Sequence, residues 1–170
     1  NIEGYPSADF TALVLEVRPA QVTLVPDPPG VLTSNAGWDA RTHKALLQEV
    51  ITRYKAAGIR TSIFMGTDLE QIGHAADTGT DRIELYTEPY AAQYHADRDQ
   101  AVAPFVAAGE RAASLGLGLN AGHDLDLHNL RFFQQNVPHL LEVSIGHALV
   151  CDALRFGMEN TVQLYRRELR

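Results

Sequence analysis

The feature that most constrains this chain is an alternation of short β-branched runs with longer amphipathic segments, which continues to the last residue. This pattern predicts repeated βα units and a parallel sheet. Strands are expected near 1–3, 21–25, 60–65, 82–86, 117–121 and 142–145. Helices are expected near 6–17, 39–57, 68–79, 97–115, 127–135, 149–156 and 158–169, with Asp39 and Asp68 as N-caps. Residues 88–94 are expected to form an insertion with exposed aromatic side chains.

The placement of polar residues favours a closed barrel over a doubly wound sheet. No Gly-x-Gly-x-x-Gly turn follows any predicted strand. Polar residues instead stand at or near the ends of the strands, where a (β/α)₈ or TIM barrel builds its active site. These residues are Glu3, Glu84, Asn120, His123, Ser144 and His147. We expect one α/β domain over residues 1–170, with about six of eight β/α units present and the N-terminal two missing from this chain.

Charge and composition narrow the classes of function. The net charge of -7, from 14 basic and 21 acidic residues, argues against nucleic acid or an anionic membrane as partner. No apolar run is long enough to span a bilayer, and a cytoplasmic location is expected. The single cysteine, Cys151, excludes an internal disulfide framework and a thiolate-cluster metal site.

Two Gly-His pairs end the last two predicted strands, Gly122-His123 and Gly146-His147. Glycine lets backbone N–H groups approach an anion closely, and a helix start adds unpaired donors and the positive end of a dipole. Because barrel enzymes often bind phosphate at these strand ends, the pairs predict a phosphorylated small molecule as ligand. The alternative interpretation is that the glycines make tight turns and the histidines are solvated.

Two carboxylates are candidates for acid–base chemistry. Glu84 alternates with Ile83 and Leu85, so a barrel interior would bury it and disfavour its charged form. Glu3 has the same alternation. Either side chain could instead be structural. Thr33 lies in a long polar loop that is able to reach a ligand over the barrel mouth, and no metal site is expected from the histidine spacing.

Several stretches together resemble the pyridoxine 5′-phosphate synthase family, and the resemblance covers all 170 residues. The matching stretches are Asn1-Ile2-Glu3, Leu32-Thr33-Ser34 with Gly37-Trp38-Asp39, Ile83-Glu84-Leu85-Tyr86-Thr87, Leu119-Asn120-Ala121-Gly122-His123 with His128-Asn129, and Ile145-Gly146-His147-Ala148. The resemblance implies condensation of 3-amino-2-oxopropyl phosphate with 1-deoxy-D-xylulose 5-phosphate, with loss of phosphate and water. It implies no organic cofactor or metal, and a homo-oligomer, an octamer in the family.

The resemblance also assigns roles. It implies that Glu3 is an acid–base carboxylate, that His123 is a proton donor and that Glu84 stabilises the transition state. It implies that Gly146 and His147 bind aminoacetone phosphate and that Thr33 contacts the deoxyxylulose phosphate. Gly122 is included among the substrate-binding residues because it precedes His123 at the strand end.

The chain departs from the family pattern in two ways. Asp124 stands where the family commonly has glycine, and the family's Asp-His pair, its arginines and a His-x-Arg segment have no counterpart here. We therefore expect these 170 residues alone to be catalytically inactive. The alternatives are another sugar-phosphate barrel isomerase or aldolase, and a non-catalytic remnant that binds a sugar phosphate or a B6 compound. Only Lys44 and Lys55 could serve a Schiff-base aldolase, and both lie on a predicted helix.

Overall fold

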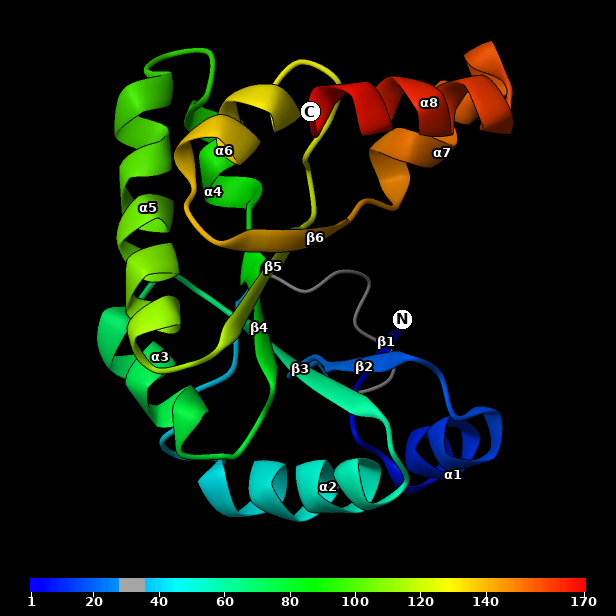
Figure 1. Ribbon diagram of the computed structural model, residues 1–170, viewed down its shortest axis with the longest axis vertical. Coiled ribbons are helices and arrows are strands. Elements are labelled where there is room, and N and C mark those ends of the chain that lie inside the picture. Colours follow the sequence, from blue (N-terminus) through cyan, green and yellow to red (C-terminus); the bar gives the residue numbers. More distant parts are fainter. Residues whose placement is uncertain (28–35) are drawn as a thin grey trace.

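A single sheet of parallel strands organises the computed structural model, which describes residues 1–27 and 36–170. Strands that are neighbours in the sheet are also consecutive along the chain, in the order β1-β2-β3-β4-β5-β6. Their bounds are β1 Ile2–Gly4, β2 Gln21–Leu24, β3 Arg60–Met65, β4 Arg82–Tyr86, β5 Gly118–Gly122 and β6 Leu140–Ser144. A doubly wound sheet reverses its strand order at a switch point, whereas this sheet curls in one direction as a half-barrel (Figure 1). The barrel prediction is confirmed.

Helices follow the strands on the outer side of the curled sheet (Figure 1). Their bounds are α1 Ala8–Val17, α2 Lys44–Ala56, α3 Leu69–Ala76, α4 Glu88–Gln93, α5 Arg98–Ser114, α6 Leu130–Asn136, α7 His147–Phe156 and α8 Met158–Glu168. The Asp68 carboxylate caps α3 as predicted, accepting hydrogen bonds from the backbone N–H groups of Glu70 and Gln71. Among the described residues, no helix is both long and apolar enough to cross a membrane.

Two expectations about helices were wrong. The helix expected from residue 39 begins at Lys44, because the Asp39 carboxylate accepts hydrogen bonds from the backbone N–H and hydroxyl of Thr42 and so caps a separate turn. The expected insertion at 88–94 contains α4. Its Tyr90 is fully buried and donates a hydrogen bond of 2.7 Å to the Asn129 carbonyl, so this aromatic side chain belongs to the core.

The central strands separate an apolar outer face from a polar inner face. Ile63, Ile83 and Leu119 are fully buried on the side that meets the helices. Alternate residues such as Thr23 and Glu84 point to the inside of the curl, where they meet each other across the sheet. The outer face forms the core, and the inner face carries the polar chemistry.

The last part of the fold is packed differently. We call β6, α7 and α8 the C-terminal unit. No residue of α7 is buried, and α8 buries only Thr161 and Tyr165. Tyr165 ties the two helices together by donating a hydrogen bond of 2.8 Å to Asp152. Leu154 is 85% exposed, so this unit rests on the sheet with few buried apolar side chains.

Candidate active site

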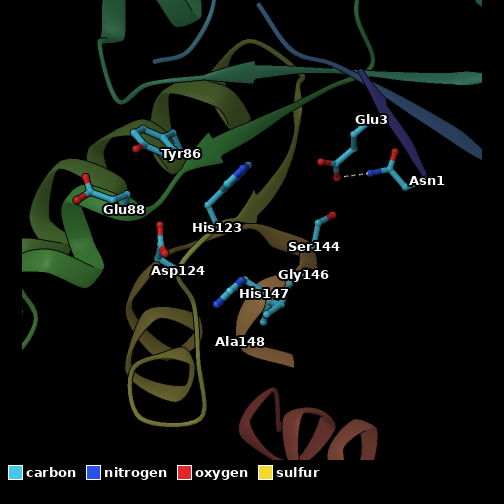
Figure 2. A pocket seen from close by; sticks show the side chains of 11 residues that line it. Asn1, Glu3, Tyr86, Glu88, His123, Asp124, Ser144, Gly146, His147 and Ala148 are labelled. Atoms are coloured by element: carbon cyan, nitrogen blue, oxygen red, sulfur yellow. Dashed lines mark hydrogen bonds between the residues drawn. The ribbon is translucent and has the colours of Figure 1, made fainter. Parts of the chain in front are cut away.

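A cavity of about 740 Å³ lies at the carboxyl ends of β4, β5 and β6, with β1 on its far side. Its lining includes Glu3, Tyr86, His123, Ser144 and the first residues of α7 (Figure 2). Figure 2 shows His123 between Tyr86 and Glu3, with His147 on the opposite wall. The structure therefore brings four of the predicted site residues, Glu3, His123, Gly146 and His147, to one cavity.

His123 is held in a defined orientation by its backbone and by two aromatic rings. Its φ of 63° is in the left-handed region, and Asp124 follows with a φ of 49°. The Thr87 hydroxyl hydrogen bonds to the carbonyl groups of Gly122 and His123. The imidazole packs 4.9 Å from the Phe64 ring and 5.8 Å from the Tyr86 ring, measured between centroids. The ring is thereby fixed at the edge of the cavity.

Glu84 lies one layer deeper than the residues that line the cavity. Its side chain is fully buried, Oε2 accepts a hydrogen bond of 3.2 Å from Thr23, and Oε1 has no hydrogen-bond partner among the described residues. Burial, reinforced by the negative charge of Glu3, raises the pKa of Glu84 to about 8. At neutral pH this carboxyl is mainly uncharged and can donate a proton.

Gly122 makes room for that buried carboxyl. A Cβ on Gly122 would lie 2.6 Å from Glu84 Oε1 and 2.6 Å from the Ser144 carbonyl oxygen. Any larger residue would displace one of these groups. Gly122 does not line the cavity, so its contact with substrate stays a prediction while its contact with Glu84 is a finding.

Glu3 is connected to Glu84 by a short series of hydrogen bonds. Asn1 donates to Glu3 Oε1 at 2.9 Å, and the Thr23 hydroxyl lies 3.1 Å from Asn1 Oδ1 and 3.2 Å from Glu84 Oε2. Partial burial raises the pKa of Glu3, while His123 and a hydrogen bond from Ser144 oppose the rise. Because Glu3 keeps contact with solvent, we assign the greater proton affinity to Glu84.

The start of α7 forms one wall of the cavity. Gly146 is the N-cap, no side chain caps the helix, and the Gly146 carbonyl accepts from Val150 N at 3.0 Å. The N–H groups of the first turn therefore lack intrahelical partners, and the helix dipole places positive potential beside them. Gly146, His147 and Ala148 all line the cavity (Figure 2). This wall can bind a phosphate group.

The structure also identifies two residues that the sequence did not single out, Tyr86 and Glu88, which line the cavity. Asp124, noted in the sequence as a departure from the family pattern, lines it as well. Tyr86 could have been found, because it stands two positions after Glu84 on the same strand and so shares its face. Thr33 lies outside the described residues. Within the described part of the chain, no group of three or more His, Cys, Asp or Glu is placed to hold a metal.

The fold and the cavity are those of a barrel-type enzyme, with side chains suited to acid–base chemistry and a helix start suited to a phosphate group. The family model of the pyridoxal phosphate biosynthesis protein PdxJ matches residues 1–170, and the chain belongs to this family.

Two curated relatives illustrate the similarity. The chain is 60% identical over 166 residues to pyridoxine 5′-phosphate synthase of Parabacteroides distasonis, which covers 98% of this chain and 70% of the relative. It is 55% identical over 170 residues to pyridoxine 5′-phosphate synthase of Cytophaga hutchinsonii, which covers 100% of this chain and 71% of the relative. The family resemblance inferred from the motifs is confirmed.

A comparison of folds agrees with the barrel. A xylose isomerase domain protein from Planctomyces limnophilus superposes with a TM-score of 0.60 at 15% identity, covering 99% of this chain and 71% of that chain. At this identity the likeness concerns the fold alone. The six parallel strands found in residues 1–27 and 36–170 form part of a TIM barrel.

Proposed function

We propose that this chain provides active-site residues for the pyridoxine 5′-phosphate synthase reaction, in which 3-amino-2-oxopropyl phosphate and 1-deoxy-D-xylulose 5-phosphate condense and the pyridine ring closes with loss of phosphate and water. The observation that carries the proposal is a fully buried Glu84 beneath a cavity lined by Glu3, His123 and a helix start without a side-chain cap. Membership of the PdxJ family supports it.

The proposed roles follow from the position of each group. The first-turn N–H groups of α7 bind the phosphate of 3-amino-2-oxopropyl phosphate, which fixes the amino and keto carbons over the cavity floor. His123 donates a proton to a departing oxygen, and Glu3 on the opposite side accepts one from carbon or nitrogen. Glu84 lies below the reacting atoms, and its ionisation would balance positive charge that develops on an iminium nitrogen.

A chimeric enzyme tests this proposal. The 166 matching residues of the Parabacteroides distasonis synthase are replaced by those of this chain, and pyridoxine 5′-phosphate is measured after both substrates are added. We expect product. His123→Ala in the chimera should lower turnover by about 10²–10⁴-fold, the usual worth of general acid catalysis. His95→Ala, an exposed position away from the cavity, is the matched control.

The outcomes separate the candidate functions. A folded chimera that binds 3-amino-2-oxopropyl phosphate but makes no product would leave only the binding function. Unchanged turnover in His123→Ala would remove His123 from the mechanism. The 170-residue chain is assayed beside the chimera, and product from it would contradict the expectation that it is inactive alone.

A homo-oligomer is proposed as well. Val150 and Leu154, four residues apart on α7, are 52% and 85% exposed, and exposed apolar side chains on one face of a helix are typical of association surfaces. Light scattering after size-exclusion chromatography measures the mass, and a monomer at every concentration tested would refute this part. A cytoplasmic location stays a prediction.

A further inference from the structure

A layer of charged side chains crosses the inside of the half-barrel just below Glu84. Arg60 of β3 and Arg82 of β4 both form ion pairs with the Glu142 carboxylate of β6, at 2.9 and 3.0 Å to the same oxygen. Arg82 also donates to Asn120 Oδ1 at 2.9 Å, and Arg60 donates to Gln21 Oε1 at 2.8 Å. The two arginines thus share one carboxylate, and two amide oxygens accept further hydrogen bonds from them.

Arg82 is close enough to Glu84 to be its natural partner. The two residues are two positions apart on β4, so their side chains leave the same face of the strand about 6.6 Å apart. Asn120, which holds Arg82, is the register neighbour of Glu84 on β5. The guanidinium group of Arg82 is therefore bonded to this neighbour of Glu84 and to Glu142, and not to Glu84 itself.

Gly118 leaves room for the Arg82 side chain to extend toward Glu142. Gly118 is the register neighbour of Arg82, and a Cβ there would lie 2.8 Å from Arg82 Cγ. The absence of that side chain lets Arg82 cross β5 toward Glu142. Arg82 is the most enclosed member of the layer, with 14% of its side chain exposed against 37% for Arg60 and 43% for Glu142.

We propose that Glu142 is a positioning residue, which holds Arg60 and Arg82 away from Glu84 and so leaves the buried carboxyl without a cation. Without Glu142, the Arg82 guanidinium would turn to the unpaired Oε1 of Glu84. A carboxylate paired with arginine is a poor proton donor at neutral pH. The role of Glu142 in catalysis rests on the proposed function. The arrangement of charges around Glu84 does not, because it can be measured without substrate.

The charged groups around Glu84 agree with this assignment. They are Glu3 from β1, Arg60 from β3, Arg82 from its own strand, His123 after β5 and Glu142 from β6. The charges of Glu3 and Glu142 raise the pKa of Glu84, and neither arginine lowers it. A cation bonded to Glu84 would act in the opposite direction.

Carboxyl titration by ¹³C NMR tests the proposal in the 170-residue chain. In Glu142→Gln, the pKa of Glu84 should fall from about 8 toward its ordinary value of 4.5. In Arg82→Gln/Glu142→Gln, which removes the competing cation, it should stay raised. Glu168→Gln removes the 2.9 Å partner of Arg131 at the surface and serves as the matched control, with Glu84 unchanged.

An unaltered Glu84 titration in folded Glu142→Gln would overturn the proposal. The proposal would also be overturned if the pKa of Glu84 fell as far in Arg82→Gln/Glu142→Gln as in Glu142→Gln, because Arg82 would then not cause the fall.

The unmodified chain provides a test that needs no folded variant. The side-chain ¹⁵N signals of Arg82 should not follow the titration of Glu84, and a shift that tracks Glu84 would overturn the proposal. All of these titrations are made without substrate. Failure here would leave product formation by the chimera untouched, and failure of the chimera would leave the charge arrangement intact.

Discussion

The central strands and the C-terminal unit follow the same βα plan but bury very different amounts of apolar surface. Helices α2, α3 and α5 each bury side chains against the sheet, among them Ile51, Ile72 and Phe105. Helix α7 buries none and leaves Leu154 85% exposed. The cavity lies between these two regions, so the proposed acid–base groups lie outside the C-terminal unit and the first-turn N–H groups of α7 lie within it. Stability and phosphate binding should therefore respond to different substitutions.

The largest expected difference is in stability. Ile63→Ala removes a fully buried side chain of β3 and should lower the free energy of unfolding by about 2–5 kcal/mol. Leu154→Ala in α7 should change it by less than about 0.5 kcal/mol, because the side chain is already in solvent. Urea unfolding monitored by circular dichroism measures both. Similar losses for the two variants would abolish the contrast between the regions.

The next effect concerns pH. Below pH 4.5 Glu84 is protonated in the folded and unfolded chain alike; between 4.5 and about 8 only the unfolded chain releases the proton, so rising pH favours unfolding. Above about 8 the folded chain holds a buried charge. Relative to Glu84→Gln, the native chain should lose on the order of a few kcal/mol between pH 4.5 and 9.

Unfolding free energies at pH 5, 7 and 9 check this prediction. Glu159→Gln on exposed α8 is the control in the C-terminal unit, and its stability should follow that of the native chain much more closely. If the Glu84→Gln curve also ran parallel to that of the native chain, Glu84 would have no raised pKa.

A smaller effect is expected at the contact between Gly122 and Glu84. Gly122→Ala places a methyl group 2.6 Å from Glu84 Oε1 and should cost about 1–3 kcal/mol of stability. The displaced carboxyl should also titrate at a different pH, which ¹³C NMR detects. Gly146→Ala is the control in the C-terminal unit, because a Cβ there meets nothing within 4 Å. Equal stability of the two variants would show that Gly122 does not support the buried carboxyl.

The smallest effect separates binding from stability. Ala148→Pro removes one first-turn N–H of α7 and should weaken binding of inorganic phosphate by about 1 kcal/mol, roughly fivefold in Kd, with little loss of stability. Glu159→Pro makes the matching change in the first turn of α8, away from the cavity. Calorimetric titration with phosphate measures both. Equal phosphate binding by the two variants would remove the start of α7 from the site.

Much of the fold could be predicted because local patterns determine it. The bounds of β3 and β4 agree with the expected 60–65 and 82–86, since β-branched runs and glycine turns mark them. Helix α4 was missed because six residues with Pro89 are too short to show a helical period. The start of α2 was missed because Asp39 has the capping chemistry of a helix but begins only a turn.

The candidate site, like the fold, could be predicted in part from the sequence. Glu3, His123 and Gly146 converge because the ends of parallel strands meet at one edge. The layer of Arg60, Arg82 and Glu142 was not predictable, since it depends on how far the strands are staggered around the curl. The absence of a cation beside Glu84 depends on the same stagger.

The left-handed turn at His123 and Asp124 has a consequence for the energetics of each catalytic cycle. The backbone of this turn and the rings of Phe64 and Tyr86 restrict the imidazole before any ligand arrives. The conformational entropy of that side chain is therefore lost when the chain folds, which happens once. It is not lost again each time substrate binds. A histidine on a freely moving loop would have to be ordered anew for each molecule of product.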